Sequence, residues 1–142
     1  QSAAMARQFG AAPRVALLSH STFGNPKMER SEKIRDAVSI LDRREDVGFE
    51  YEGEMNVDVA LNADIRELYP FSRLSEAANV LVMPGLHSTH IATRLAHRLG
   101  GGTTIGPLLI GLERPVQLVP MDASVSQLVD MACLAAHQAI QR

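Results

Sequence analysis

A polar segment at residues 19–27 carries the first side chains that could bind a ligand. It reads SHSTFGNPK and provides hydroxyl groups from Ser19, Ser21 and Thr22 and an ammonium group from Lys27. Hydroxyl and ammonium donors suit phosphate or carboxylate groups. The segment matches neither a Walker nor a dinucleotide-binding fingerprint. We therefore predict an anion-binding loop, and a polar turn that holds no ligand is the alternative.

A second polar segment, PGLHSTH at residues 84–90, follows the apolar run NVLVM. His87 and Ser88 lie at the expected start of a helix, whose free backbone N–H groups could receive a phosphate or carboxylate. His87 and His90 are three residues apart, but no cysteine, acidic cluster or zincin glutamate accompanies them. The sequence therefore predicts no metal site here. We predict that this segment binds an anion, and a capped strand-to-helix turn that holds no ligand is the alternative.

Apolar runs and amphipathic helical patterns alternate along the chain and would position both polar segments. Strands are expected at residues 14–18, 49–52 and 79–83. A helical pattern follows each strand, over residues 31–41, 58–68 and 88–99. Asp58 is expected to cap the second of these helices. In the last of these, Ile91, Leu95 and Leu99 recur on one face and are expected to be buried.

The end of the chain adds two further predictions. Residues 108–112 and 116–119 flank the turn residues Glu113, Arg114 and Pro115, which favours an antiparallel hairpin. Ser124 and Gln127 form a capping box for a final helix expected to bury an apolar face containing Val125, Leu128, Val129 and Ala132. Residues 1–13 are expected to contain the end of a preceding helix.

The order of these elements predicts one α/β subdomain over residues 1–142. We expect a three-layer α/β/α fold, with a mainly parallel sheet and an added antiparallel strand. In open sheets of this kind, ligands bind beyond the carboxyl ends of the strands, where both polar segments would lie. A polar cluster of Gly53, Glu54, Asn56 and Asp58 is a lesser candidate, and the mixed charges of residues 29–44 are expected to form a solvated face.

The composition is that of an ordinary globular chain. Of its 142 residues, 46% are hydrophobic, and 14 basic against 16 acidic residues give a net charge of −2. This balance gives no electrostatic reason for nucleic acid or an anionic membrane as a partner. No apolar run approaches the roughly 20 residues that span a bilayer. The single Cys133 cannot form an internal disulfide. Because proteins of oxidising compartments commonly carry disulfides, we expect a cytoplasmic protein.

Four segments in order resemble the C-terminal part of phosphate acetyltransferases: PRVALLSHST, EGEMNVDVAL, NVLVMPGLHSTHIATRLAHRLGG and TTIGPLLIGLERPVQ. That family has a strand followed by Ser-Tyr-Ser-Thr, a Gly-Glu-Leu-Gln segment, and an Ile-Gly-Pro strand before a proline-bearing turn. The resemblance covers nearly the whole chain. It implies an isocitrate dehydrogenase-like fold, in which two α/β subdomains form a cleft for acetyl-CoA. The length of this chain corresponds to one of these subdomains. The candidate contacts for acetyl-CoA or phosphate are Ser19, Ser21, Thr22, Lys27, His87 and Ser88.

The positions that carry catalysis in this family hold other residue types here. Active members resemble one another in a Pro-Val-Asn-Asp-Leu-Ser-Arg-Gly segment and an aspartate in the first turn of the final helix. Aligned on Pro115 and Val116, the chain places Pro120 at the serine, Met121 at the arginine and Gln127 at the aspartate. Losing one oxyanion donor costs about 10²–10³ in rate, and losing a general acid or base about 10²–10⁴. We therefore expect no catalytic residue in this chain.

Two further segments, PVQLVPMDASVSQLVDMACLAAHQA and YPFSRLSEAANVLVMPGLHS, resemble the C-terminal phosphotransacetylase-like domain of large bacterial malic enzymes. The resemblance implies a regulatory and oligomerising domain that responds to acetyl-CoA. It also implies an N-terminal region that converts malate to pyruvate with NADP or NAD and with Mg or Mn, whereas this chain holds no cofactor of its own. The expected partners are that region, the first subdomain of the same protein, and a second copy.

Two alternatives remain open. The first is an active phosphate acetyltransferase with a rearranged site, in which His87 or His90 acts as the base. The second is a purely structural dimerisation module whose old cleft is empty.

Overall fold

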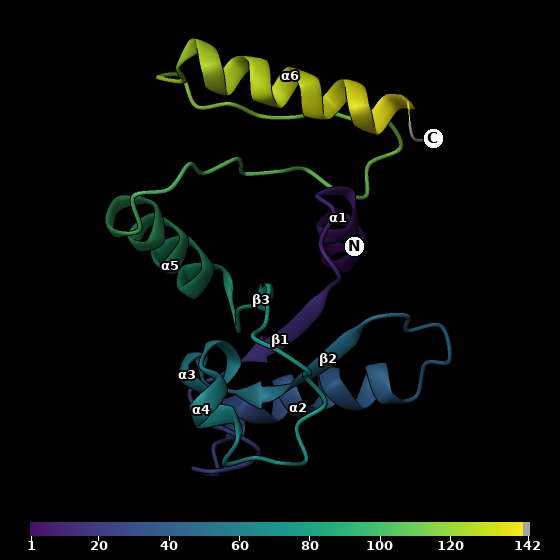
Figure 1. Cartoon of the computed structure of the whole chain (residues 1–142), viewed down its shortest axis with the longest axis vertical. Helices are drawn as coiled ribbons and strands as arrows, with labels where there is room; N and C mark the ends of the chain where they lie inside the picture. The colour runs from purple at the N-terminus through teal and green to yellow at the C-terminus, as the bar shows by residue number, and fades with distance from the viewer. Residues whose placement is uncertain (141–142) are drawn as a thin grey trace. The chain divides into compact units, whose positions relative to one another are not determined.

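The computed structural model describes residues 1–140, which group into two compact units. The first unit is Ser2–Ala92, and the second contains Gln1 and the described residues from Thr93 onward. The elements of the first unit are α1 (Ser2–Gln8), β1 (Arg14–Leu18), α2 (Glu29–Asp42), β2 (Glu50–Met55), α3 (Val57–Leu61), α4 (Ala63–Arg66) and β3 (Val80–Val82) (Figure 1). Helix α5 (Leu86–Leu99) begins in the first unit and ends in the second, which also contains α6 (Val125–Ile140).

The first unit is built on a parallel sheet with strand order β2-β1-β3. Strand β1 is a run of apolar residues after Arg14, as expected for a strand that is covered on both faces. Val15 and Leu17 belong to a core cluster with Ala3 of α1 and Ile34 and Val38 of α2. The alternate residues of β1 pack on the other face, in a cluster with α3 and the chain after α4 whose buried members are Ala16, Leu18, Met55, Val59, Ala60, Leu74 and Ala78. The expected mainly parallel, three-layer α/β arrangement is confirmed.

A β-bulge interrupts the pairing of β1 with β2. Leu17 lies opposite Gly53 but Leu18 lies opposite Met55, so Glu54 is the extra residue. Gly53 has φ +157°, and a Cβ atom there would lie 2.7 Å from the carbonyl oxygen of Leu17. Only glycine therefore permits this close approach of the two strands.

The helix expected at residues 58–68 is two short helices. Asn56, not Asp58, caps α3, because its side chain accepts a hydrogen bond of 2.9 Å from the backbone N–H of Val59. Asn62 ends α3 and caps α4, accepting from the backbone N–H of Asp64 at 2.9 Å. Asparagine competes with the helix for backbone donors, which explains the break.

The second unit confirms one prediction and contradicts another. The capping box is present: the backbone N–H of Ser124 donates to Gln127 Oε1 at 2.9 Å, and that of Gln127 to Ser124 Oγ at 3.3 Å. The hairpin prediction is wrong, because within residues 1–140 the segments 108–112 and 116–119 form no strands. Instead, the side-chain amide of Gln117 bonds the N–H of Leu109 at 3.1 Å and its C=O at 3.3 Å. A side chain thus occupies the backbone groups that an antiparallel partner would use.

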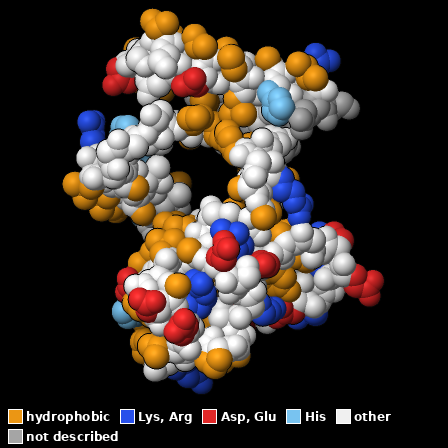
Figure 2. All heavy atoms as spheres, in the orientation of Figure 1, with side chains coloured by type: hydrophobic (Ala, Val, Ile, Leu, Met, Phe, Trp, Pro, Cys, Tyr) orange, Lys and Arg blue, Asp and Glu red, His pale blue; other side chains and the backbone are white. Residues whose placement is uncertain are grey.

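Apolar side chains are exposed along both long C-terminal helices (Figure 2). The expected burial is wrong for Ile91, Leu95 and Leu99 of α5, and also for Val125, Leu128 and Val129 of α6. Ala132 of α6 is exposed as well. The periodicity correctly predicted the two helices, but the part of the chain that the structure describes does not cover these faces. No helix among the described residues is long and apolar enough to cross a membrane.

Candidate functional site

The loop after β1 is fastened to the end of β2. The backbone N–H of Ser19 donates to the carbonyl of Met55 at 2.9 Å, and that of Phe23 to the carbonyl of Glu54 at 2.8 Å. The backbone N–H of Asn56 donates to Thr22 Oγ1 at 3.1 Å. Backbone hydrogen bonds in both directions between residues 22 and 25 close the loop into a turn. The loop predicted to bind an anion therefore has a defined shape.

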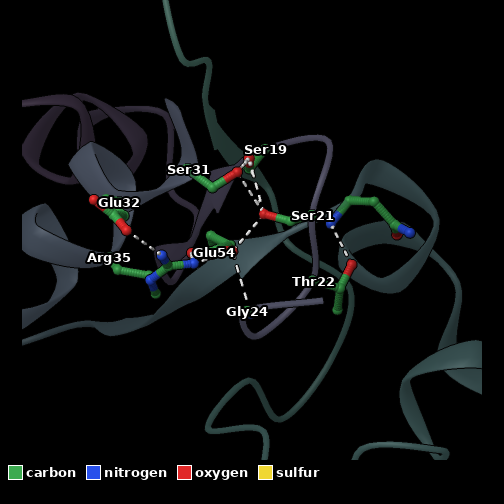
Figure 3. Close-up of polar contacts among 9 residues, drawn as sticks. Ser19, Ser21, Thr22, Gly24, Ser31, Glu32, Arg35 and Glu54 are labelled. Atoms are coloured by element: carbon green, nitrogen blue, oxygen red, sulfur yellow. Dashed lines mark hydrogen bonds and ion pairs between the residues drawn. The ribbon is translucent and has the colours of Figure 1, made fainter. Parts of the chain in front are cut away.

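A buried carboxylate lies under this loop. Glu54 is 0% exposed, and its Oε1 accepts hydrogen bonds from the Ser21 hydroxyl and from the backbone N–H of Gly24 at 3.2 Å. Nη1 of Arg35 lies 2.9 Å from Oε1 and 3.1 Å from Oε2 (Figure 3). An ionised carboxylate is costly to bury without such donors, so Arg35 supplies the compensating charge. Arg35 also reaches Glu32 on the surface, with an N–O distance of 3.7 Å.

Serine hydroxyls continue the polar network above the carboxylate. Ser21 Oγ and Ser31 Oγ are 2.6 Å apart, and Ser31 Oγ is 2.9 Å from Ser19 Oγ. Ser21 and Ser31 are both buried, whereas Ser19 is half-buried. One connected network therefore joins the end of β1 to helix α2 through the bulge of β2 (Figure 3).

The structure brings only some of the predicted contact residues together. Ser19, Ser21 and Thr22 share the loop, and the hydroxyls of the buried Ser21 and Thr22 bind other parts of the chain. Lys27 is exposed at the end of the loop. His87 and Ser88 are exposed in the first turn of α5. Among the described hydrogen bonds, the network under the loop does not extend to Lys27, His87 or Ser88, and the ligand contacts of all six residues stay predictions.

Sequence reasoning missed Ser31 and Arg35 as parts of this network. The mixed charges of residues 29–44 were expected to form a solvated face, which is wrong for Arg35, because it pairs with a fully buried glutamate. Ser31 and Arg35 are four residues apart and therefore lie on one face of α2. This spacing was the feature of the sequence that could have identified them as partners in the network. Glu54 belonged to the lesser polar cluster, and its burial could not be read from that cluster.

A second ion-pair network surrounds Arg73. Its Nη2 lies 2.9 Å from Oε1 of Glu52, which is buried, and its Nη1 lies 2.5 Å from Oδ1 of Asp42. The Asp42 pKa is lowered, mainly by the hydrogen bond from Arg73 and then by that from the Tyr51 hydroxyl. Burial, followed by the hydrogen bond to Asp42, raises the pKa of Tyr51, and the hydrogen bond to Glu52 raises that of Arg73. This network ties the segment around Arg73 to β2 and is structural.

A small pocket in the second unit contains two of the positions singled out for catalysis. Its volume is about 10 Å³, which is roughly room for one water molecule. The lining residues are Thr104, Ile105, Gly106, Leu118, Val119, Pro120, Gln127, Asp130 and Met131. Met121 is fully exposed. The described residues contain no group of three or more His, Cys, Asp or Glu side chains that could hold a metal ion.

Comparison with known proteins places this chain in a family. Residues 1–136 match the family model described as phosphate acetyl/butaryl transferase. The chain belongs to that family. It is 56% identical over 139 residues to the NADP-dependent malic enzyme of Rhizobium meliloti, covering 98% of this chain and 18% of the relative. It is 34% identical over 145 residues to the phosphate acetyltransferase of Staphylococcus aureus strain Mu50, covering 99% and 44%.

The fold of this phosphate acetyl/butaryl transferase chain also matches a solved family structure. The EutD phosphotransacetylase from Staphylococcus aureus superposes with a TM-score of 0.90 at 34% identity, covering 97% of this chain and 43% of that one. The chain thus spans less than a fifth of the malic enzyme and under half of the acetyltransferases. The resemblance to the C-terminal phosphotransacetylase-like domain of malic enzymes is confirmed.

Proposed function

We propose that this chain is a regulatory and oligomerising domain of an NAD(P)-dependent malic enzyme and forms one wall of an acetyl-CoA-responsive cleft. The complete enzyme would convert malate to pyruvate in the cytoplasm, using NADP or NAD and Mg or Mn held by a region outside this chain. The similarity to a malic enzyme over 98% of the chain supports the choice of parent protein. The expected partners are that region, the first subdomain of the same protein and a second copy.

One observation carries the non-catalytic role. Acetyl transfer to phosphate needs an oxyanion donor, a cation for the phosphate and a group that manages the proton of the thiol. Pro120 has no hydroxyl, Met121 extends into solvent without charge, and the side chain of Gln127 caps α6. The oxygen of Gln127 is thus already bonded to a backbone N–H, and an amide does not take up a proton near neutral pH.

The polar loops supply what a binding role needs. Lys27 offers an exposed ammonium group and Ser19 a half-buried hydroxyl at the carboxyl end of β1, while His87 and Ser88 begin α5. Ammonium and hydroxyl groups suit the phosphates of acetyl-CoA. If acetyl-CoA binds one conformation of the assembly better than another by about 1–3 kcal/mol, the affinity for malate changes about 5- to 150-fold.

The test uses the full-length protein that contains this chain. Malate oxidation is followed as NADPH or NADH formation with Mg²⁺ or Mn²⁺ while acetyl-CoA is titrated, and binding is measured by calorimetry. We expect acetyl-CoA to bind and to shift the malate concentration for half-maximal rate at least 5-fold, in line with the coupling range above. Lys27→Gln should weaken acetyl-CoA binding. Lys33→Gln removes the same charge from an exposed position on α2 and should not weaken it.

The other two functions predict different results. Formation of acetyl phosphate from acetyl-CoA and phosphate, lost in His87→Ala or His90→Ala, would favour an active transferase. An unchanged oligomer without acetyl-CoA binding would favour a structural module. Unaltered malate kinetics at saturating acetyl-CoA would overturn the regulatory proposal.

A further inference from the structure

Loop 19–25 is held mainly by contacts with residues 54–56. Glu54 contributes most, because its backbone carbonyl accepts from Phe23 and its carboxylate accepts from both Ser21 and Gly24. We infer that Glu54 is a positioning residue, whose buried carboxylate sets the conformation of the ligand loop and couples that loop to helix α2. The inference rests on the proposed function only for the identity of the ligand.

The β-bulge directs Glu54 towards α2. In regular pairing Glu54 would point to the same sheet face as Glu52, because side chains two residues apart share a face. The extra residue changes this alternation, so that Met55 takes the place opposite Leu18 in the apolar core. Glu54 is then directed towards Ser31 and Arg35, the two α2 residues of the network. Gly53 allows this local geometry.

The charge of Glu54 is what links the loop to α2. On one side, its carboxylate accepts from a hydroxyl and a backbone N–H of the loop; on the other, it receives the guanidinium of Arg35. Every one of these groups is a donor, and all three lie within hydrogen-bond distance of Oε1, so one charged acceptor joins the loop to Arg35. A shift of α2 would therefore move the carboxylate away from its loop donors. A change in the loop would in turn alter the contact between Glu54 and Arg35.

The geometry also separates the supporting residues from those that could face a ligand. Ser21 and Thr22 are buried and bonded within the chain, so they shape the loop. Ser19, which is half-buried and bonded to Ser31 at 2.9 Å, begins this shaped segment, and the exposed Lys27 follows it. Their positions relative to an incoming phosphate group therefore depend on the carboxylate beneath the loop.

Glu54→Gln is the decisive substitution, and Glu32→Gln is its matched control. Glutamine keeps the volume of Glu54 but removes the charge opposite Arg35 and places an NH₂ group where Oε2 accepts from Nη1 of Arg35. Glu32 lies on helix α2 with Arg35 and contacts that arginine at 3.7 Å, but its side chain is half-exposed. Glu54→Gln introduces an amide into a buried site and could destabilise the fold. Ser21→Ala is therefore the second variant, since it removes one loop donor and leaves the ion pair between Glu54 and Arg35.

The first readout is hydrogen–deuterium exchange of peptides that cover residues 19–25 in the full-length protein. We expect exchange to be about tenfold faster in both variants, since Ser21→Ala removes a hydrogen bond to a charged group and Glu54→Gln removes the charge from that group. Exchange of peptides covering β1 should change less than twofold. Unaltered exchange of residues 19–25 in folded Ser21→Ala and Glu54→Gln would overturn the positioning role.

The second readout is the acetyl-CoA concentration that gives a half-maximal effect on malate oxidation. It should rise about tenfold in Glu54→Gln, because the hydrogen bonds from the loop then end on an uncharged group, and stay within twofold in Glu32→Gln. The rate without acetyl-CoA should be unchanged, whereas general destabilisation would lower it. If the wild-type enzyme ignores acetyl-CoA, the proposed function fails while the exchange readout still decides the role of Glu54.

Discussion

Replacing Arg73 with methionine tests how far one arginine stabilises the first unit. Arg73 gives Glu52 three of its hydrogen bonds, from Nε at 3.2 Å, Nη2 at 2.9 Å and its own backbone N–H at 2.9 Å. It also pairs with Asp42, and its guanidinium carbon lies 4.6 Å from the ring centre of Tyr51. Methionine keeps the length of the side chain and the backbone donor but removes the charge opposite a buried carboxylate.

The expected loss is about 2–3 kcal/mol of unfolding free energy. Removing one partner of a buried ion pair costs about 3–5 kcal/mol in general. Two features lower that figure: the Arg73 side chain is 42% exposed, so water can replace it, and Glu52 keeps the backbone N–H donors of Gly53 and residue 73. The exposed pair with Asp42 and the ring contact add about 0.5 kcal/mol each.

Urea unfolding followed by tyrosine emission measures this loss in the correct part of the molecule. Both tyrosines, Tyr51 and Tyr69, lie in the first unit, and the chain has no tryptophan. Arg44→Met is the control, because it removes an exposed pair with Asp46 and should leave the urea midpoint close to that of the wild type. If Arg73→Met and Arg44→Met unfolded at the same urea concentration, the buried carboxylate would not depend on Arg73, and the reasoning would be refuted.

Two further changes test the bulge and the ion pair. Gly53→Ala should cost about 2–4 kcal/mol, because its Cβ would lie 2.9 Å from the Cβ of Leu17, whereas Gly85→Ala places its Cβ in open space; equal urea midpoints for the two would contradict this. The lowered pKa of Asp42 stabilises the fold above the ordinary carboxyl pKa, and this contribution is lost as the pH falls through the lowered value. The urea midpoint of the wild type should therefore drop more steeply below about pH 4 than that of Asp42→Asn, and parallel curves would argue against a role for the Arg73 contact.

Strand β1 was predictable because burial on both faces leaves a clear signal in the sequence, whereas the strand predicted over residues 49–52 missed the bulged end of β2, which runs to Met55. The strand over residues 14–18 was predicted with the bounds that β1 has, since its apolar residues are continuous. The predicted helix over residues 58–68 failed at Asn62, whose side chain begins a new helix. The predicted hairpin failed at Gln117, whose amide bonds the backbone of Leu109. In both cases one polar side chain redirected the backbone, which apolar periodicity does not register.

The candidate site was predictable as a location but not as a network. Polar residues after β1 identify the loop at the carboxyl edge of the sheet, as expected for this fold class. The partner of that loop depends on the bulge at Glu54, because a shift of one residue exchanges the two faces of a strand. In EGEM, regular alternation would place Glu52 and Glu54 on one face, yet the structure pairs them with different arginines, Arg73 and Arg35. A bulge is set by contacts with the neighbouring strand, so the glutamate that supports the loop is identified only once β1 and β2 are paired.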